Sequence, residues 1–507
     1  MSDERQIWHS DGNAATPERE DGSEGDPEQS QRNGTAPVIV PDEIKPAAAA
    51  PAAHVSDAAA RTQQLTEGPI GATLWRLAIP LAFGFVINAI YSWTDMYFVS
   101  RLGDTATAAL GFSDQINFVL FTIGSGFGIG TGIVVARRMG ERRSRQASLI
   151  ATQAFSFMAI YSSVAAVALY FILPYCFPLF GLEGEMLQLT EEFLLTLLIG
   201  FPGNLLTFQC NATVRSTGNT VFPMAVLIIS ALVNVIVDPI LIFGMFGMPA
   251  MGIRGAALST SIAMWVGAII GMYALYAGKL NIRLYRPTLR FDWSIIRSIF
   301  RIGIPSSLQT LSVSTARVLI ITIANMFGTA AAAAYTIGLR VDVLVFMPIF
   351  ATGIAIETLV SQNIGAGRLD RVEQFRRTAI RQLGGIIIGM GILIYFFAGN
   401  IARIFTSDAR VIELTEQYLH IAVFGYIFFV VGQSATRALS GAGHALRSML
   451  IVAAILFLVQ VPLAYVLARF TPLQETGVFL SITVSYLVLA IAGGFAVRGD
   501  KWMMKRF

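Results

Sequence analysis

Apolar runs of about 20 residues recur along the chain from roughly Leu77 to Val497, and short polar segments separate them. A helix of about 20 residues rises about 30 Å, which is the thickness of the hydrocarbon core of a bilayer. We count twelve such runs in the sequence. The pattern therefore predicts an all-α integral membrane protein with twelve transmembrane helices.

Composition agrees with this class. Of the 507 residues, 54% are hydrophobic and only 13% are charged, and the mean hydropathy of +0.63 excludes an ordinary soluble domain. Residues 1–67 differ, because they are rich in Asp, Glu, Ser, Pro and Ala, and we expect them to form a disordered cytoplasmic tail. This stretch has no apolar segment of the signal-peptide kind, so the first span is expected to direct insertion.

Lys and Arg cluster after the second, sixth, eighth and twelfth apolar runs. The positive-inside rule then places the even-numbered links and both termini on the cytoplasmic side, and we expect a multi-pass protein of the cell inner membrane. No nucleic-acid partner is needed to explain these charges. The clustered residues are Arg137, Arg138, Arg142, Arg143 and Arg145; Lys279, Arg283, Arg286, Arg290 and Arg297; Arg368, Arg371, Arg376 and Arg377; and Lys501, Lys505 and Arg506.

The chain also contains an internal repeat at a constant shift of 225 residues. The segment WRLAIPLA at Trp75–Ala82 aligns with FRIGIPSS at Phe300–Ser307 without a gap. Glycines and prolines, whose backbone roles other residues rarely replace, recur at the same shift. The halves are therefore predicted to be homologous six-helix units. Recurring glycines include Gly103 and Gly328, Gly128 and Gly353, Gly140 and Gly365, and Gly218 and Gly443.

The repeat divides the membrane part into two pseudo-symmetric lobes. We predict an N-lobe at residues 68–277, a cytoplasmic linker at 278–292, a C-lobe at 293–498 and a cytoplasmic C-terminal tail at 499–507. Because six is even, both lobes enter from the cytoplasm, and transporters with such parallel repeats alternate access by moving one lobe against the other. Pro80 is a candidate hinge within the first span; the alternative is that it only marks a helix start.

Acidic residues of the first half are lost in the second. Asp95 lies in the first span and Asp238 in the fifth, and both align with apolar residues of the second half. Asn234 and Asp238 share one helical face, as do Asn88, Tyr91 and Asp95. A carboxylate in hydrocarbon is costly and is usually functional or paired, so these groups are expected to form one shared site. The alternatives are an interfacial role for Asp95 and a structural hydrogen bond for Asp238.

The second half has charged residues of its own. Arg317 lies late in the seventh span and Asp342 early in the eighth, so both are expected at a similar outer depth and to form an ion pair. Their repeat partners, Ser92 and Asn117, are uncharged. Glu357 lies toward the cytoplasmic end of the eighth span, where water can reach it, and its role is left open.

These features, in this order, resemble the multidrug and toxic compound extrusion (MATE) family of transporters. The resemblance covers about 68–498 and rests on the two lobes, the Ile-Pro pair near the start of each, RSTGNTVFP at Arg215–Pro223 and GIAIETLVSQNIGAGR at Gly353–Arg368. The NVIVDP segment of the fifth span is similar to the DinF-like branch. The NorM-like pattern has a Glu in the seventh span, where this chain carries Gln309 and Val313.

The resemblance implies a cation site for H⁺ or Na⁺ within the first lobe. Apart from Na⁺ at this site, no metal is expected, and no cofactor is expected. The implied cation-binding residues are Asp95, Asn234, Asp238 and, as the best match in the sixth span, Thr260, with Asn88 and Tyr91 as supporting polar groups.

We therefore expect an efflux antiporter rather than an enzyme, which exports amphiphilic, often cationic small molecules in exchange for H⁺ or Na⁺. It is expected to act as a monomer in the lipid bilayer. A flippase for lipid-linked saccharide precursors is the alternative, but Arg317 is too isolated to favour the cationic cavity of that class. A membrane-embedded enzyme is a remote alternative, because the sequence contains no DDxxD, HxxxH or HxxxxD motif.

Overall fold

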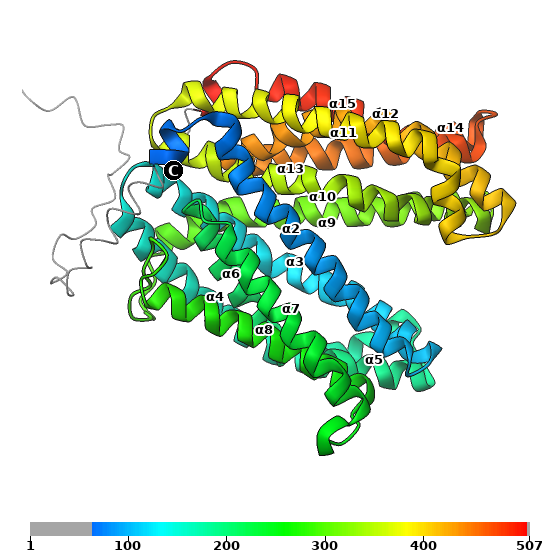
Figure 1. Cartoon of the computed structure of the whole chain (residues 1–507), viewed down its shortest axis with the longest axis horizontal. Coiled ribbons are helices and arrows are strands. Elements are labelled where there is room, and N and C mark those ends of the chain that lie inside the picture. The colour runs from blue at the N-terminus through cyan, green and yellow to red at the C-terminus, as the bar shows by residue number, and fades with distance from the viewer. Residues whose placement is uncertain (1–62, 504–507) are drawn as a thin grey trace, which may run out of the picture. The chain divides into compact units, whose positions relative to one another are not determined.

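The computed structural model of the chain describes residues 63–503, and every regular element in that range is a helix (Figure 1). Short 3₁₀ turns lie at Phe177–Phe180, Met245–Gly247 and Lys501–Met503. The first half contributes α2 (Ile70–Ser100), α3 (Asp104–Gly140), α4 (Ser144–Cys176), α5 (Gly184–Leu197), α6 (Phe201–Ser216), α7 (Val221–Phe243) and α8 (Gly252–Tyr276). The second half contributes α9 (Trp293–Asn325), α10 (Thr329–Gly365), α11 (Leu369–Phe405), α12 (Ala409–Gly441), α13 (Ala445–Ala454), α14 (Val461–Phe470) and α15 (Gln474–Ala496).

Eleven spans among the described residues are long and apolar enough to cross a membrane, with α13 and α14 forming one of them through a π-helical turn at Ile455–Gln460. The helices α5 and α6 meet at a bend of 49° and together supply a twelfth. Pro202 lies in the first turn of α6, where its missing N–H and fixed φ favour the start of a new helix. The predicted all-α fold with twelve transmembrane spans is confirmed, with the fourth span broken.

The packing of the helices reproduces the internal repeat. The first helix of each half packs against the second helix of the other half: α2 against α10, and α9 against α3. Separate hydrophobic clusters fill the two halves, one centred on α3 to α8 and one on α9 to α15. Two lobes related by a pseudo-twofold axis require this reciprocal arrangement.

The backbones of the two lobes approach each other closely where α3 and α10 end. A Cβ atom added to Gly140 would lie 2.0 Å from the carbonyl oxygen of Gln362, and one added to Gly365 would lie 2.2 Å from that of Arg137. These two contacts are equivalent under the repeat. Both lie beside the basic clusters, so the lobes are closed at the end that the sequence predicts to be cytoplasmic.

The predicted disordered tail, residues 1–67, falls largely outside the described part, which begins at residue 63. Its last five residues, 63–67, are helical, and Leu65 is only 4% exposed. For these residues the prediction of disorder is wrong, because an apolar side chain in a polar stretch finds a buried site between distant parts of the chain.

The segment around Leu65 contacts both lobes at their closed end. The Leu65 side chain packs against Gly218, in the turn between α6 and α7. The Leu65 carbonyl oxygen accepts a hydrogen bond from Nδ2 of Asn363 on α10 at 3.3 Å, and the Gly68 carbonyl accepts one from Arg371 on α11 at 2.5 Å. The segment therefore links the N-lobe to the C-lobe.

The connection between α8 and α9 lies along α4. Three of its backbone N–H groups donate to hydroxyl oxygens that are spaced one helical turn apart on α4. The bonds join Arg283 to Ser148 at 3.3 Å, Tyr285 to Thr152 at 3.0 Å and Thr288 to Ser156 at 3.2 Å. The connection is therefore attached to the N-lobe.

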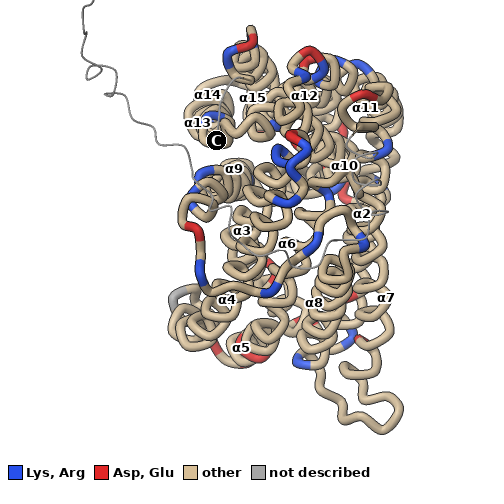
Figure 2. Tube along the Cα trace, turned by 90° about the vertical axis from the view of Figure 1, so that its left-hand side faces the viewer, with Lys and Arg blue, Asp and Glu red and all other residues tan. Residues whose placement is uncertain are grey.

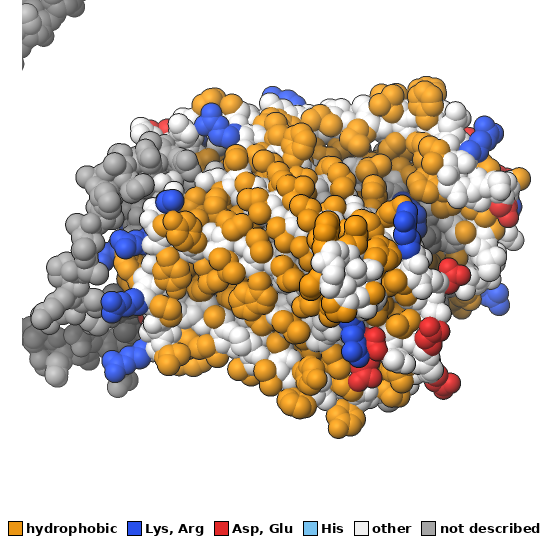
Figure 3. Space-filling model, turned by 60° about the horizontal axis from the view of Figure 1, so that its bottom comes forward, with side chains coloured by type: hydrophobic (Ala, Val, Ile, Leu, Met, Phe, Trp, Pro, Cys, Tyr) orange, Lys and Arg blue, Asp and Glu red, His pale blue; other side chains and the backbone are white. Residues whose placement is uncertain are grey.

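Exposed apolar side chains cover the middle of the surface, and charged side chains gather toward its ends (Figure 3). A band of this extent would be costly in water and matches the hydrocarbon of a bilayer. Figure 2 views the molecule from the end where α2 begins, and Lys and Arg mark many of the loops and helix ends there. The described chain also finishes at this end, since Leu65 and Trp502 share one buried cluster.

Candidate functional site

The first lobe contains a buried polar site between α7 and α8. Asn234 and Asp238 lie one turn apart on α7, and both side chains are 0% exposed. The neighbouring helix α8 brings Ser259 and Thr260 to the same depth. The predicted shared face of Asn234 and Asp238 is thus turned toward α8 rather than toward lipid.

Hydrogen bonds connect these side chains into one network. Nδ2 of Asn234 lies 3.2 Å from each of three acceptors: Oδ1 of Asp238, Oγ of Ser259 and Oγ1 of Thr260. Ser259 donates its hydroxyl proton to the same oxygen of Asp238. Tyr91 on α2 donates to Oγ1 of Thr260 at 3.3 Å and so links the first span to the network.

Three oxygens of this region are buried and accept no hydrogen bond from the described residues: Oδ1 of Asp95, Oδ1 of Asn234 and Oδ2 of Asp238. A buried acceptor without a partner costs about 1–3 kcal/mol, and more when it is charged. A proton or a hard cation would remove that cost, because carboxylate, amide and hydroxyl oxygens are the ligands such ions prefer. The donor set around these atoms fits either ion.

Asp95 is half-buried on α2, within electrostatic range of Asp238 and of Asp114 on α3. Sequence reasoning missed Asp114 and Ser259. Their repeat partners are Leu339 and Val484, so the loss of polarity across the repeat, which identified Asp95, would also have found them.

Asn88 is not part of this network. Its side chain is exposed on α2 and forms no hydrogen bond within residues 63–503. In the same range, no group of three or more His, Cys, Asp or Glu side chains is arranged to hold a metal ion. The described oxygens therefore differ in kind from a multi-carboxylate metal centre.

The prediction of an ion pair between Arg317 and Asp342 is wrong. Both oxygens of the Asp342 carboxylate accept hydrogen bonds from tyrosines instead, at 2.6 Å from Tyr418 and 2.7 Å from Tyr426. Both tyrosines belong to α12, which packs against α10. Arg317 affects Asp342 electrostatically but lies beyond ion-pair distance. The sequence of the seventh and eighth spans alone does not reveal α12 as the partner.

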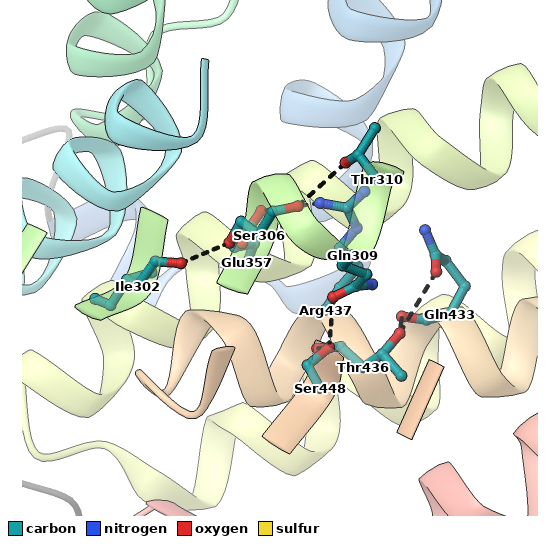
Figure 4. A network of polar contacts seen from close by, with 9 residues as sticks. All are labelled: Ile302, Ser306, Gln309, Thr310, Glu357, Gln433, Thr436, Arg437 and Ser448. Carbon is teal, nitrogen blue, oxygen red and sulfur yellow. Dashed lines mark hydrogen bonds and ion pairs between the residues drawn. The ribbon is translucent and has the colours of Figure 1, made fainter. Parts of the chain in front are cut away.

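Glu357, whose role the sequence left open, is paired with Arg437 of α12, at 3.4 Å between Oε2 and Nη1 (Figure 4). The Glu357 side chain is 9% exposed and that of Arg437 is 24% exposed. In the first lobe the equivalent residues are Gly132 and Ala212, so this pair is specific to the second lobe.

Pro80 lies well inside α2, which begins at Ile70. The alternative that it only marks a helix start is therefore wrong. A proline within a helix removes a backbone hydrogen bond and allows bending.

Two six-span lobes related by an internal repeat, with a buried polar site in one of them, define a two-lobe membrane transport protein. The family model MatE matches residues 80–240 and 305–466. The chain therefore belongs to the MATE family, whose members are transporters and not enzymes. The two matched segments begin 225 residues apart, which confirms the internal repeat.

Similar proteins span most of the chain. A probable multidrug resistance protein NorM of Thermotoga maritima is 29% identical over 85% of this chain and 92% of its own length. An FAD transporter of Shewanella oneidensis is 26% identical over 84% of this chain and 94% of its own. A solved outward-facing conformation of a multidrug resistance MATE family transporter superposes with a TM-score of 0.80 at 24% identity, over 85% of this chain and 96% of that one, and supports the fold.

Proposed function

We propose that this protein exports amphiphilic, often cationic compounds across the inner membrane in exchange for H⁺ or Na⁺, which binds at Asp95, Asn234, Asp238 and Thr260. The relatives named as multidrug resistance proteins support the cargo class. The observation that carries the exchange is the set of three buried oxygens without partners. All of them belong to one chain, so the proposal needs only a monomer.

The ion and the cargo are linked through charge. An ionised carboxylate that is buried without a counter-charge is unfavourable. A conformation that excludes water from the site therefore needs a bound cation there. In the proposed cycle, the ion enters from outside, neutralises Asp95 and Asp238, and favours release of a cationic cargo to the outside. When the lobes return to the conformation that is open to the cytoplasm, the ion is released there.

The close contacts at Gly140 and Gly365 close the end at which both termini are proposed to lie in the cytoplasm. They support the proposal that this conformation is open to the outside. Pro80 is proposed as a hinge of α2, whose first turns belong to the closed end. The assignment of this chain to the DinF-like branch of the family remains a prediction. Arg437 gives the flippase alternative no support, because it is paired with Glu357.

The test is efflux of a fluorescent cationic dye from proteoliposomes, driven in separate experiments by a pH gradient and by a sodium gradient. Asp238→Asn and Asp95→Asn should each abolish gradient-driven efflux, because a neutral amide neither binds a proton nor attracts Na⁺ in the same way. Asp104→Asn is the matched control, since Asp104 is an exposed aspartate at the start of α3. Unchanged efflux in Asp238→Asn would reject the proposed site.

A further inference from the structure

The C-lobe encloses a cavity of about 200 Å³ that the proposed cation site does not use. It lies among α9, α10, α12, the π-helical turn and α15, which all contribute lining residues. This volume is smaller than the roughly 300–1,000 Å³ of pockets for drug-sized ligands. It suits one flat group of a small molecule rather than a large drug.

Aromatic rings form much of the cavity wall. The ring of Phe429 lies 4.7 Å from that of Phe346 and 4.9 Å from that of Tyr486, measured between centroids. Tyr335 and Tyr418 line the same space. Such surfaces favour a flat aromatic ligand, because rings gain both buried area and stacking.

Three of these five wall residues are specific to the C-lobe, whereas Phe346 and Tyr418 correspond to Phe121 and Phe193 of the first lobe. At the positions of Tyr335, Phe429 and Tyr486, the first lobe has Leu110, Asn204 and Ser261. The part of the aromatic wall formed by Tyr335, Phe429 and Tyr486 is therefore not shared by the two lobes, just as the acidic site of the N-lobe is not.

The cavity has one charged group that lacks a partner. Both oxygens of Asp342 are occupied by tyrosine hydroxyls, and Arg437 is paired with Glu357. Within the described range, Arg317 lines the cavity, is partly exposed to solvent, and forms no hydrogen bond or ion pair. It offers several N–H donors in a plane, which match a carboxylate, phosphate or sulfonate.

A second unmatched group is Gln460, at the end of the π-helical turn. Its side chain is 7% exposed, it lines the cavity, and its Oε1 accepts no hydrogen bond from the described residues. The equivalent part of α7 is regular α-helix with Val235 at this position. Single π-helical turns are frequent at functional sites, and this one places a polar group at the cavity.

Polar contacts hold one of the lining residues, Gln309, in place. Ser448 donates to Oε1 of Gln309 at 3.2 Å and to the carbonyl oxygen of Thr436 at 3.0 Å. Figure 4 shows Gln309 with Ser448, Gln433 with Thr436, and the pair of Arg437 and Glu357. Gln309 and Gln433 therefore present amides to the cavity from two different helices.

We propose that this cavity binds a planar aromatic group that carries a negative charge, with its ring against Phe429 and Tyr486 and its anionic group on Arg317. The amide of Gln460 hydrogen-bonds a polar edge of the ring system. The protein then has two sites of opposite preference, one for a cation in the N-lobe and one for an aromatic anion in the C-lobe.

The test is equilibrium dialysis of radiolabelled 2-naphthoate against the purified full-length protein in lipid nanodiscs, with empty nanodiscs subtracted. Its two fused rings and its carboxylate supply the flat aromatic surface and the negative charge of the proposed ligand. Two probes of the same ring system, neutral 2-naphthamide and cationic 2-naphthyltrimethylammonium, separate the contribution of charge. The proposal expects saturable binding of the anion and weaker binding of both other probes.

Arg317→Gln should weaken naphthoate binding by about tenfold or more, because a charge-assisted hydrogen bond is lost, and should leave naphthamide binding nearly unchanged. Gln460→Leu should leave the binding of both nearly unchanged, because the naphthalene ring offers no polar edge to the Gln460 amide. Arg340→Gln is the matched control, since Arg340 is an exposed arginine on α10 that does not line the cavity. Thermal unfolding of each variant checks that it folds.

Equal binding in the Arg317→Gln and control proteins would overturn the proposal, as would preferred binding of the trimethylammonium probe. None of these measurements requires an ion gradient. A failure here is therefore distinct from a failure of the proposed antiport.

Discussion

Replacing Gly140 by alanine tests whether the contact between α3 and α10 holds the cytoplasmic end closed. The new Cβ would lie 2.0 Å from the carbonyl oxygen of Gln362 and 2.9 Å from its Cα, whereas real Cβ atoms do not approach heavy atoms within 3.0 Å. These neighbours are backbone atoms and cannot rotate away. The two helices must therefore separate locally by at least about 1 Å.

Such overpacking costs about 1–3 kcal/mol. Because the contact joins the two lobes, only the state closed at the cytoplasmic end bears this cost. The ratio of that state to the one open to the cytoplasm should fall by roughly 5- to 150-fold. Gly365→Ala, the equivalent change on α10, should act in the same direction, and the double variant should act more strongly.

The assay is a spin-label distance distribution in nanodiscs. The sequence has only two cysteines, Cys176 and Cys210, so a cysteine-free background needs few changes. Labels at Arg143 and Arg368, which are exposed and equivalent under the repeat, report the separation of the lobes at this end. Gly140→Ala should add a population at longer distance.

Gly389→Ala is the matched control, because a Cβ at this helical glycine of α11 meets no atom within 4 Å. It should leave the distance distribution unchanged. The same distribution in Gly140→Ala as in the parent protein would refute the reasoning that this contact belongs to the closed state alone.

Three further outcomes are expected. Ser259→Ala removes a hydrogen bond that stabilises the ionised Asp238 carboxylate, worth about 1.5–3 kcal/mol, so the site should bind a proton more tightly and half-maximal proton-driven efflux should need about tenfold less H⁺; an unchanged proton titration would contradict this. Leu65→Ala removes buried contacts worth about 2–5 kcal/mol and should speed the hydrogen exchange of backbone amides at the closed end. The same exchange rates in the variant and in the parent protein would disprove this. Arg437→Gln removes the ion-pair partner of the buried Glu357 and leaves only the more distant Arg215 as a cation near it, so it should lower stability by about 3 kcal/mol; thermal unfolding should recover when Glu357→Gln is added.

Much of the site could be predicted from the chain itself because its parts are close in sequence or related by the repeat. Asn234 and Asp238 are one turn apart, so helical geometry alone puts them on one face. Asp95 was found because its equivalent, Ile320, is apolar. Ser259 and Asp114 left the same signal and were overlooked.

Other contacts could not be predicted in this way. Asp342 is bonded by Tyr418 and Tyr426, which lie 76 and 84 residues further along the chain. The direct ion pair with Arg317 was inferred from a similar depth in the membrane. Depth does not specify which side of a helix faces which neighbour, and here α12 lies where the pair would have formed.

The sequence by itself determined the membrane class, the two lobes and the lobe that retains unpaired acids, because hydropathy, periodicity and an internal shift are properties of the chain alone. Only the tertiary structure decided which end of the lobes is closed, where Leu65 is buried and which groups surround Arg317. These depend on contacts between helices far apart in sequence, and such contacts are selected by the shape and packing of whole helix surfaces.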